Sequence, residues 1–175
     1  MSVFEEKFDL LNLDSVECAN YLRYVAANKF GLNLNMTQVQ KLLYMAYGIT
    51  LSSCKVQLTD ERPQTWPFGP VFANVHEYTD FRYTPRKPTN LLPNETVRLF
   101  EKLLKRFGET NDRTLSMWAC NPDRRNPWVK AKPRFFWQKW GKYISNTDIY
   151  YWFQSMEQRV KRNQNKQRKR KQAND

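Results

Sequence analysis

Residues 36–78 read MTQVQKLLYMAYGITLSSCKVQLTDERPQTWPFGPVFANVHEY, and the two ends of this stretch decide the fold. The first end predicts a helix, because Thr37 and Gln40 have the spacing of a capping box and an apolar stripe follows at helical intervals. Gly48 lies inside that stripe, which indicates either close packing against another helix or an early helix end. The second end, WPFGPV at 66–71, joins two prolines and a glycine to two large aromatic residues and predicts a rigid corner.

Capping residues and apolar repeats predict further helices on both sides of this stretch. Asp14 and Glu17 have capping spacing ahead of one repeat, and Asn94 stands before another that closes at Gly108, a residue suited to a left-handed C-terminal cap. The last helix is expected to begin near Ser145. Its apolar stripe consists of Ile149, Trp152, Phe153, Met156 and Val160.

Short elements are expected between the long helices. Residues 71–79 predict a short helix with Pro70 in its first turn, and residues 112–119 predict another. Alternation between 55 and 68 predicts two short strands or a hairpin-like excursion, confined to sheet edges by its prolines. The expected fold is therefore mainly α, a compact helical domain with a small β-hairpin-like element and a basic C-terminal extension.

Composition favours one folded domain. The chain has 175 residues, of which 41% are hydrophobic and 15% aromatic. It has no apolar run of about 18 residues, so we expect no membrane span, and the acidic N-terminal residues do not resemble a secretory signal. The three cysteines, Cys18, Cys54 and Cys120, are odd in number and widely spaced. This pattern favours a reducing compartment and predicts a cytoplasmic protein without membrane partners.

Most of the net charge of +12 lies at the C-terminus. Residues 159–175 hold eight basic residues and one acidic residue, whereas residues 1–158, the predicted globular domain, hold 21 basic and 16 acidic residues. Such a tail is either a solvated extension, helical or disordered, or a non-specific contact with nucleic-acid phosphates. The candidate nucleic-acid-binding residues are Arg159, Lys161, Arg162, Lys166, Arg168, Lys169, Arg170 and Lys171.

A second basic segment, PWVKAKPRFFWQKWGKY at 127–143, interleaves cations with aromatic residues. Its aromatic residues either stack single-stranded bases or pack onto the helices while the basic groups face water. We favour packing, because a small domain needs bulky residues to close its core. The aromatic residues are Trp128, Phe135, Phe136, Trp137, Trp140 and Tyr143.

The sequence offers little for catalysis. The single histidine, His76, has no metal ligands at suitable spacing and no cysteine nearby in sequence. There is no glycine-rich phosphate-binding loop. We therefore expect a protein that is not an enzyme and that needs no cofactor or metal.

Two motifs carry a resemblance to a known family. QKLLYMAYG at 40–48, followed by WPFGPV at 66–71, resembles the Panacea (SocA-like or GepA-like) antitoxin domain of bacterial mobile elements and prophages. Further matches are Leu115-Ser116, Pro127-Trp128 and the closing helix at 149–153, so the resemblance spans about Leu13 to Met156. The chain departs from the family at Ala119-Cys120, where a Thr-His pair is frequent, and in its basic tail.

The resemblance implies a mainly helical fold and a function of binding, in which the protein neutralises a toxin or another protein target by direct contact. The target would be a toxin or a component of a host defence system attacked by a phage. The corner at 66–71 either contacts the partner or locks the core. The candidate partner-binding residues are Tyr44, Tyr47, Trp66, Phe68, Gly69, Pro70, Trp118 and Trp128. The alternative function is that of a nucleic-acid-binding accessory protein, using the tail and residues 128–143.

Overall fold

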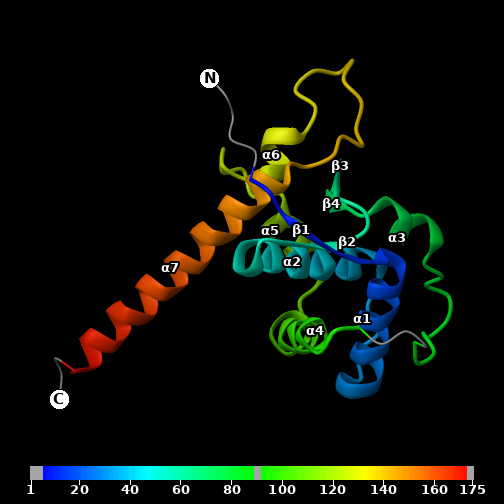
Figure 1. The fold of residues 1–175 in the computed structure, drawn as a ribbon, viewed down its shortest axis with the longest axis horizontal. Helices are drawn as coiled ribbons and strands as arrows, with labels where there is room; N and C mark the ends of the chain where they lie inside the picture. Colours follow the sequence, from blue (N-terminus) through cyan, green and yellow to red (C-terminus); the bar gives the residue numbers. More distant parts are fainter. Residues whose placement is uncertain (1–5, 89–91, 173–175) are drawn as a thin grey trace.

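A computed structural model describes residues 6–88 and 92–172 of the chain. It confirms the mainly α fold with a small β part (Figure 1). In chain order the elements are β1 (Asp9–Leu13), α1 (Ser15–Phe30), α2 (Met36–Cys54), β2 (Val56–Thr59), β3 (Gln64–Trp66), β4 (Gly69–Val71), α3 (Ala73–Tyr78), α4 (Asn94–Phe107), α5 (Asp112–Ala119), α6 (Pro127–Ala131) and α7 (Asn146–Gln172).

Helix α2 lies at the centre of the fold. It contacts α1, α4, α5, α7, β2 and β4 (Figure 1). Ten consecutive residues, Val39–Gly48, are buried, so this part of the helix is enclosed on every side and not along one stripe only. The core around it includes Leu22 of α1, Phe100 of α4 and Phe153 of α7.

Gly48 marks a close crossing of two helices. Helix α2 continues to Cys54, so the glycine does not end it. A Cβ added at Gly48 would overlap the ring of Phe153 on α7. Of the two interpretations of this glycine, close packing is therefore confirmed.

Two short strands, β2 and β3, lie between residues 55 and 68 as expected, but they do not pair with each other as a hairpin. Strand β2 pairs in parallel with β1, through Asp9 opposite Val56 and Leu10 opposite Gln57. Strand β3 pairs with β4 in antiparallel register, so the hairpin spans 64–71 and not 55–68. Pro70 accordingly lies in β4, and the expectation that it opens a helix is wrong, because α3 begins three residues later.

Some predicted caps are confirmed and others move. Asp14 caps α1 as expected, accepting a hydrogen bond from the amide of Glu17 at 2.9 Å. The capping box of α2 is formed by Asn35 and Gln38 and not by Thr37 and Gln40. The expectation that Asn94 caps α4 is wrong, because Asn94 is the first residue of the helix and Pro93 precedes it. The left-handed cap expected at Gly108 is also absent, since its φ is −60°.

Helix α7 has two different halves. Its first turns bury Ile149, Tyr150, Trp152 and Phe153 against the body. From residue 158 onward every described residue is exposed, and the helix projects away from the rest of the fold (Figure 1). The tail, as far as residue 172, is thus a continuation of the last helix. None of the helices within 6–88 and 92–172 combines the length and apolar character needed to cross a bilayer.

The crossing of α2 and α7 predicts a size-dependent loss of stability. Gly48→Ala gains at most about 1 kcal/mol of helix propensity. We expect the overlap with Phe153 to cost more, so that the free energy of unfolding falls by about 1–3 kcal/mol. Chemical denaturation measures this loss. In a Phe153→Leu background the same substitution should cost clearly less, and an equal cost in both backgrounds contradicts the close crossing.

Candidate binding surface

Two polar side chains of α2 hold the hairpin β3–β4. Gln40 lies among apolar neighbours and is buried. Its amide oxygen accepts a hydrogen bond from the backbone N–H of Phe72 at 2.8 Å, and its amide nitrogen donates to the backbone oxygen of Phe72 at 3.0 Å. Gln40 thus satisfies both backbone groups of Phe72, as a neighbouring strand would.

Lys41 makes the next contact with the same corner. The side chain is only 2% exposed, and its Nζ donates to the backbone oxygen of Pro70 at 3.0 Å. Burial lowers the pKa of Lys41 to about 8, because the interior disfavours the charged ammonium, although the nearby thiol of Cys120 opposes this shift. Gln40 and Lys41 of the first motif therefore bind the backbone that follows Gly69, at Phe72 and Pro70.

Gly69 permits this contact. Its φ of +113° is a backbone conformation that other residues resist, and a Cβ at this position would lie 3.0 Å from Cε and Nζ of Lys41. The same Cβ would lie 3.3 Å from Sγ of Cys120. The corner is compact because α2 approaches it so closely.

A long loop docks against the other edge of the hairpin. The amide of Thr65 donates to the backbone oxygen of Lys142 at 2.8 Å, and the amide of Gly141 donates to the oxygen of Thr65 at 2.7 Å. The indole nitrogen of Trp128 donates to the oxygen of Trp66 at 2.9 Å. These bonds fix both ends of the loop that follows α6, which arches away from the body in yellow and orange (Figure 1).

This loop and the hairpin tip expose large aromatic side chains, which we call the aromatic platform. Phe136 is 97% exposed, Phe68 is 79% exposed and Trp137 is 65% exposed. The rings of Phe135 and Trp137 stack 4.6 Å apart, and Trp140 stacks on the buried Trp128. The members of the platform are Phe68, Phe135, Phe136, Trp137, Trp140 and Tyr143. Exposed cations stand between them, namely Arg134, Lys139 and Lys142.

The aromatic platform corrects the favoured interpretation of residues 127–143. Trp128 packs into the core as expected. The remaining five aromatic residues of the segment are exposed, so the expectation that they pack onto the helices is wrong for them. The loop has no amphipathic helix to turn its rings inward, since α6 ends at Ala131.

The structure divides the eight candidate partner-binding residues into accessible and buried ones. Phe68 is exposed, and Trp66 and Trp118 are half-buried. The remaining five residues are buried in this structure, which does not favour direct contact with a partner at these positions. These are Tyr44, Tyr47, Gly69, Pro70 and Trp128.

The buried tyrosines take part in the core. Tyr44 packs edge-on against Phe153 and lies beside Trp118, so it belongs to the contact between α2 and α7. The hydroxyl of Tyr47 donates to the side-chain oxygen of Asn146 at 2.7 Å, which fixes the start of α7. Their position inside α2 explains both roles.

Gln40 and Lys41 are the positioning residues that the sequence pattern does not reveal. The pattern places Gln40 in a helix cap and gives Lys41 no role. A signal is nevertheless present, because a polar pair follows Val39 and precedes Leu42 on a helix without a free polar face. Buried polar residues of this kind need partners, and such partners are found in β4 and directly after it.

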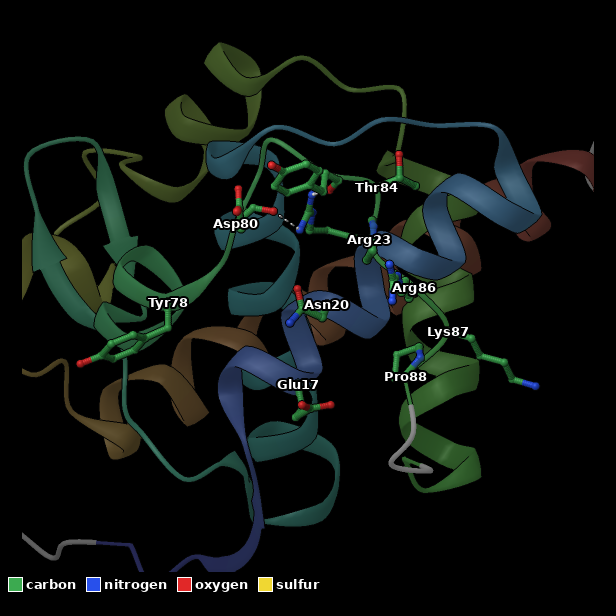
Figure 2. A pocket seen from close by; sticks show the side chains of 11 residues that line it. Glu17, Asn20, Arg23, Tyr78, Asp80, Thr84, Arg86, Lys87 and Pro88 are labelled. Carbon is green, nitrogen blue, oxygen red and sulfur yellow. Dashed lines mark hydrogen bonds between the residues drawn. The ribbon is translucent and has the colours of Figure 1, made fainter.

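A polar hollow lies on another part of the molecule, between α1 and the loop after α3 (Figure 2). Arg23 of α1 points into the loop and donates to the backbone oxygens of Asp80 at 3.0 Å and Tyr83 at 2.7 Å. Its guanidinium also lies 4.3 Å from the ring centre of Phe81. Arg23 is thereby occupied in holding the loop, and the hollow carries charges of both signs, including Glu17 and Arg86.

The single histidine and the three cysteines are the other candidates for a reactive or metal-binding site. His76 is exposed, with its ring 4.8 Å from the ring of Trp66. In the part of the chain that the structure describes, no three histidine, cysteine, aspartate or glutamate side chains gather as metal ligands. The three cysteines are free.

Comparison with protein-family models, with curated proteins and with solved structures finds no match to this chain. The Panacea-like resemblance thus stays a prediction that rests on the motifs. The structure does give a physical reason for two of them to occur together, because Gln40 and Lys41 of the first motif bind the backbone at Pro70 and Phe72, within and just after the second.

The corner predicts a difference between two glycines. Gly69→Ala should lower the free energy of unfolding by about 1–3 kcal/mol, because the substitution strains the backbone and crowds Lys41. Gly31→Ala is the matched control, since Gly31 also has a positive φ, +66°, but a Cβ added there would meet nothing within 4 Å. Its loss should be smaller, about 1 kcal/mol. Equal losses, measured by chemical denaturation, contradict the close approach of α2.

Proposed function

We propose that this protein is a non-enzymatic binding module that neutralises a protein target by direct contact through its aromatic platform. One observation carries the proposal. Six large aromatic side chains are exposed on a hairpin tip and a loop whose ends are hydrogen-bonded to the hairpin. Exposed apolar groups that cluster, as the rings of Phe135, Phe136 and Trp137 do, are typical of interaction sites.

The composition of the platform supports a protein as its partner. Tryptophan, tyrosine and arginine are enriched among the residues that supply most of the binding energy in protein interfaces. The stacking of Phe135 on Trp137 limits their side-chain freedom before binding, so less entropy is lost on association. Lysines around the aromatic centre suit a polar rim that faces acidic groups of the partner.

The role of the target follows from the resemblance to the Panacea domain. It favours an antitoxin, or a phage-encoded inhibitor of a host defence system, over other binding proteins. We propose that the protein acts in the cytoplasm, because all three of its cysteines are free. Position 120 also holds a cysteine where the family frequently has a histidine, and its thiol lies beside Lys41, in the corner and not on the platform.

Paired variants test the platform. The protein is co-expressed with the product of the adjacent gene, and growth rescue and affinity by calorimetry are measured together. Phe136→Ala combined with Trp137→Ala should weaken binding by about 30-fold or more, as expected for interface anchors. Circular dichroism should show an unchanged fold, because both side chains are exposed.

The matched control is Tyr83→Ala. Tyr83 is an equally exposed aromatic residue, 68% accessible, on the loop after α3. The Tyr83→Ala variant should bind the neighbouring gene product as tightly as the unaltered protein does. Wild-type affinity in the platform variant contradicts the proposal. No affinity of the unaltered protein for the neighbouring gene product contradicts the antitoxin role.

A further inference from the structure

The free half of α7, residues 158–172, is a second charged feature that the aromatic platform does not use. We call it the basic helix end. It holds eight cations and no acidic residue. Arg159 lies 4.0 Å from Asp123, whereas the other seven make no salt bridge with any residue that the structure describes. Every described residue of the segment is exposed, although Val160, Lys161 and Gln164 line one side of a groove against α2, α4 and α5.

The cations fall on two opposite sides of the helix. At about 100° per residue, five of them lie within an arc of roughly 100°, and the other three are centred on the far side. The first row comprises Arg159, Arg162, Lys166, Lys169 and Arg170, and the second comprises Lys161, Arg168 and Lys171. Asparagine and glutamine fill most of the positions between the rows.

This arrangement is unfavourable without an anionic partner. Like charges stand four residues apart at Arg162 and Lys166, and again at Lys166 and Arg170, and each such pair destabilises a helix. The side chains of these three residues are exposed, so burial does not compensate for the repulsion within the pairs. A ligand that places anions on both sides would therefore stabilise the helix as it binds.

Several anionic partners fit poorly. A membrane surface requires an apolar face, and Val160 is the sole large apolar residue of the segment. Single-stranded nucleic acid is bound by aromatic stacking, for which the segment has no side chain. A flat acidic protein surface would contact one row and leave the other in water.

We propose that the basic helix end binds double-stranded DNA, lying in the major groove with one row of cations toward each phosphate backbone. The major groove is about 12 Å wide and admits an α-helix, with phosphates on both sides. The segment of 15 residues spans about 22 Å, less than one turn of the duplex. The groove of an RNA duplex is too narrow and deep for this geometry.

This site is separate from the aromatic platform. The platform loop leads into the first turn of α7, and the basic helix end is the opposite end of the same 27-residue helix (Figure 1). A helix of this length measures about 40 Å. A protein target and a DNA duplex therefore contact different ends of the molecule, and loss of one function leaves the other measurable.

Fluorescence anisotropy of the full chain with a labelled 20-base-pair DNA duplex tests the site. If seven or eight phosphates are neutralised, the logarithm of affinity should fall against the logarithm of salt with a slope of about −6 to −7. Affinity should then decrease on the order of ten-thousandfold between 50 and 200 mM salt. A slope shallower than about −3 overturns the proposal.

Two matched triple variants test the geometry. The first carries Arg162→Gln, Lys166→Gln and Lys169→Gln, and the second carries Lys161→Gln, Arg168→Gln and Lys171→Gln. Each removes three charges from one row. Both should weaken binding to a similar extent and reduce the salt slope by about 3. Loss confined to one row would show that the helix lies on a surface and not in a groove, which overturns the proposal.

Two further comparisons distinguish a helix in DNA from a flexible basic tail. Gln167→Pro keeps all eight charges but breaks the helix, so it should weaken binding about tenfold or more. Unaltered affinity in this variant overturns the helical site. Duplex RNA of the same length should bind more weakly than the DNA duplex. Poly-glutamate of matched charge that binds as tightly as the DNA duplex contradicts a nucleic-acid partner.

Discussion

The enclosure of α2 on every side is the constraint on which the rest of the structure depends. A helix in such a position has no solvated face, so Gln40 and Lys41 must find partners in the interior. They find them in the backbone at Pro70 and Phe72. These bonds fix β4, the hairpin places Trp66 and Thr65, and those residues hold the loop that carries the exposed rings. The binding surface is thus supported from the centre of the core outward.

Much of the fold could be predicted from local signals in the sequence. Apolar repeats identified the long helices, because these depend on neighbours three or four residues away. The strand partners could not be predicted in this way, since β1 and β2 are separated by the whole of α1 and α2. Gln40 illustrates how a tertiary contact can override a local signal. Its spacing suits a helix cap, but in the folded protein it binds the backbone of Phe72.

The candidate site was harder to predict than the fold. Tyr44 and Tyr47 lie in the motif that carries the resemblance, yet motif membership does not distinguish a residue that packs from one that binds. The reverse error occurred in the loop after α6, where aromatic residues were expected to enter the core. The sequence does indicate that these rings are exposed, because the aromatic residues in PRFFWQKWGK follow neither a helical nor a strand period. Rings without periodicity next to proline and glycine cannot share one buried face.

The central claim is that Gln40 acts as the strand neighbour of Phe72 and so supports the binding surface, and hydrogen exchange at the amide of Phe72 tests it most directly. In the unaltered protein this buried amide should exchange as slowly as those of Leu42 and Leu43 in α2. In Gln40→Met, which keeps the side-chain length but removes the amide group, exchange at Phe72 should accelerate about tenfold or more while the α2 amides stay protected. Undiminished protection of Phe72 in this variant would contradict the claim.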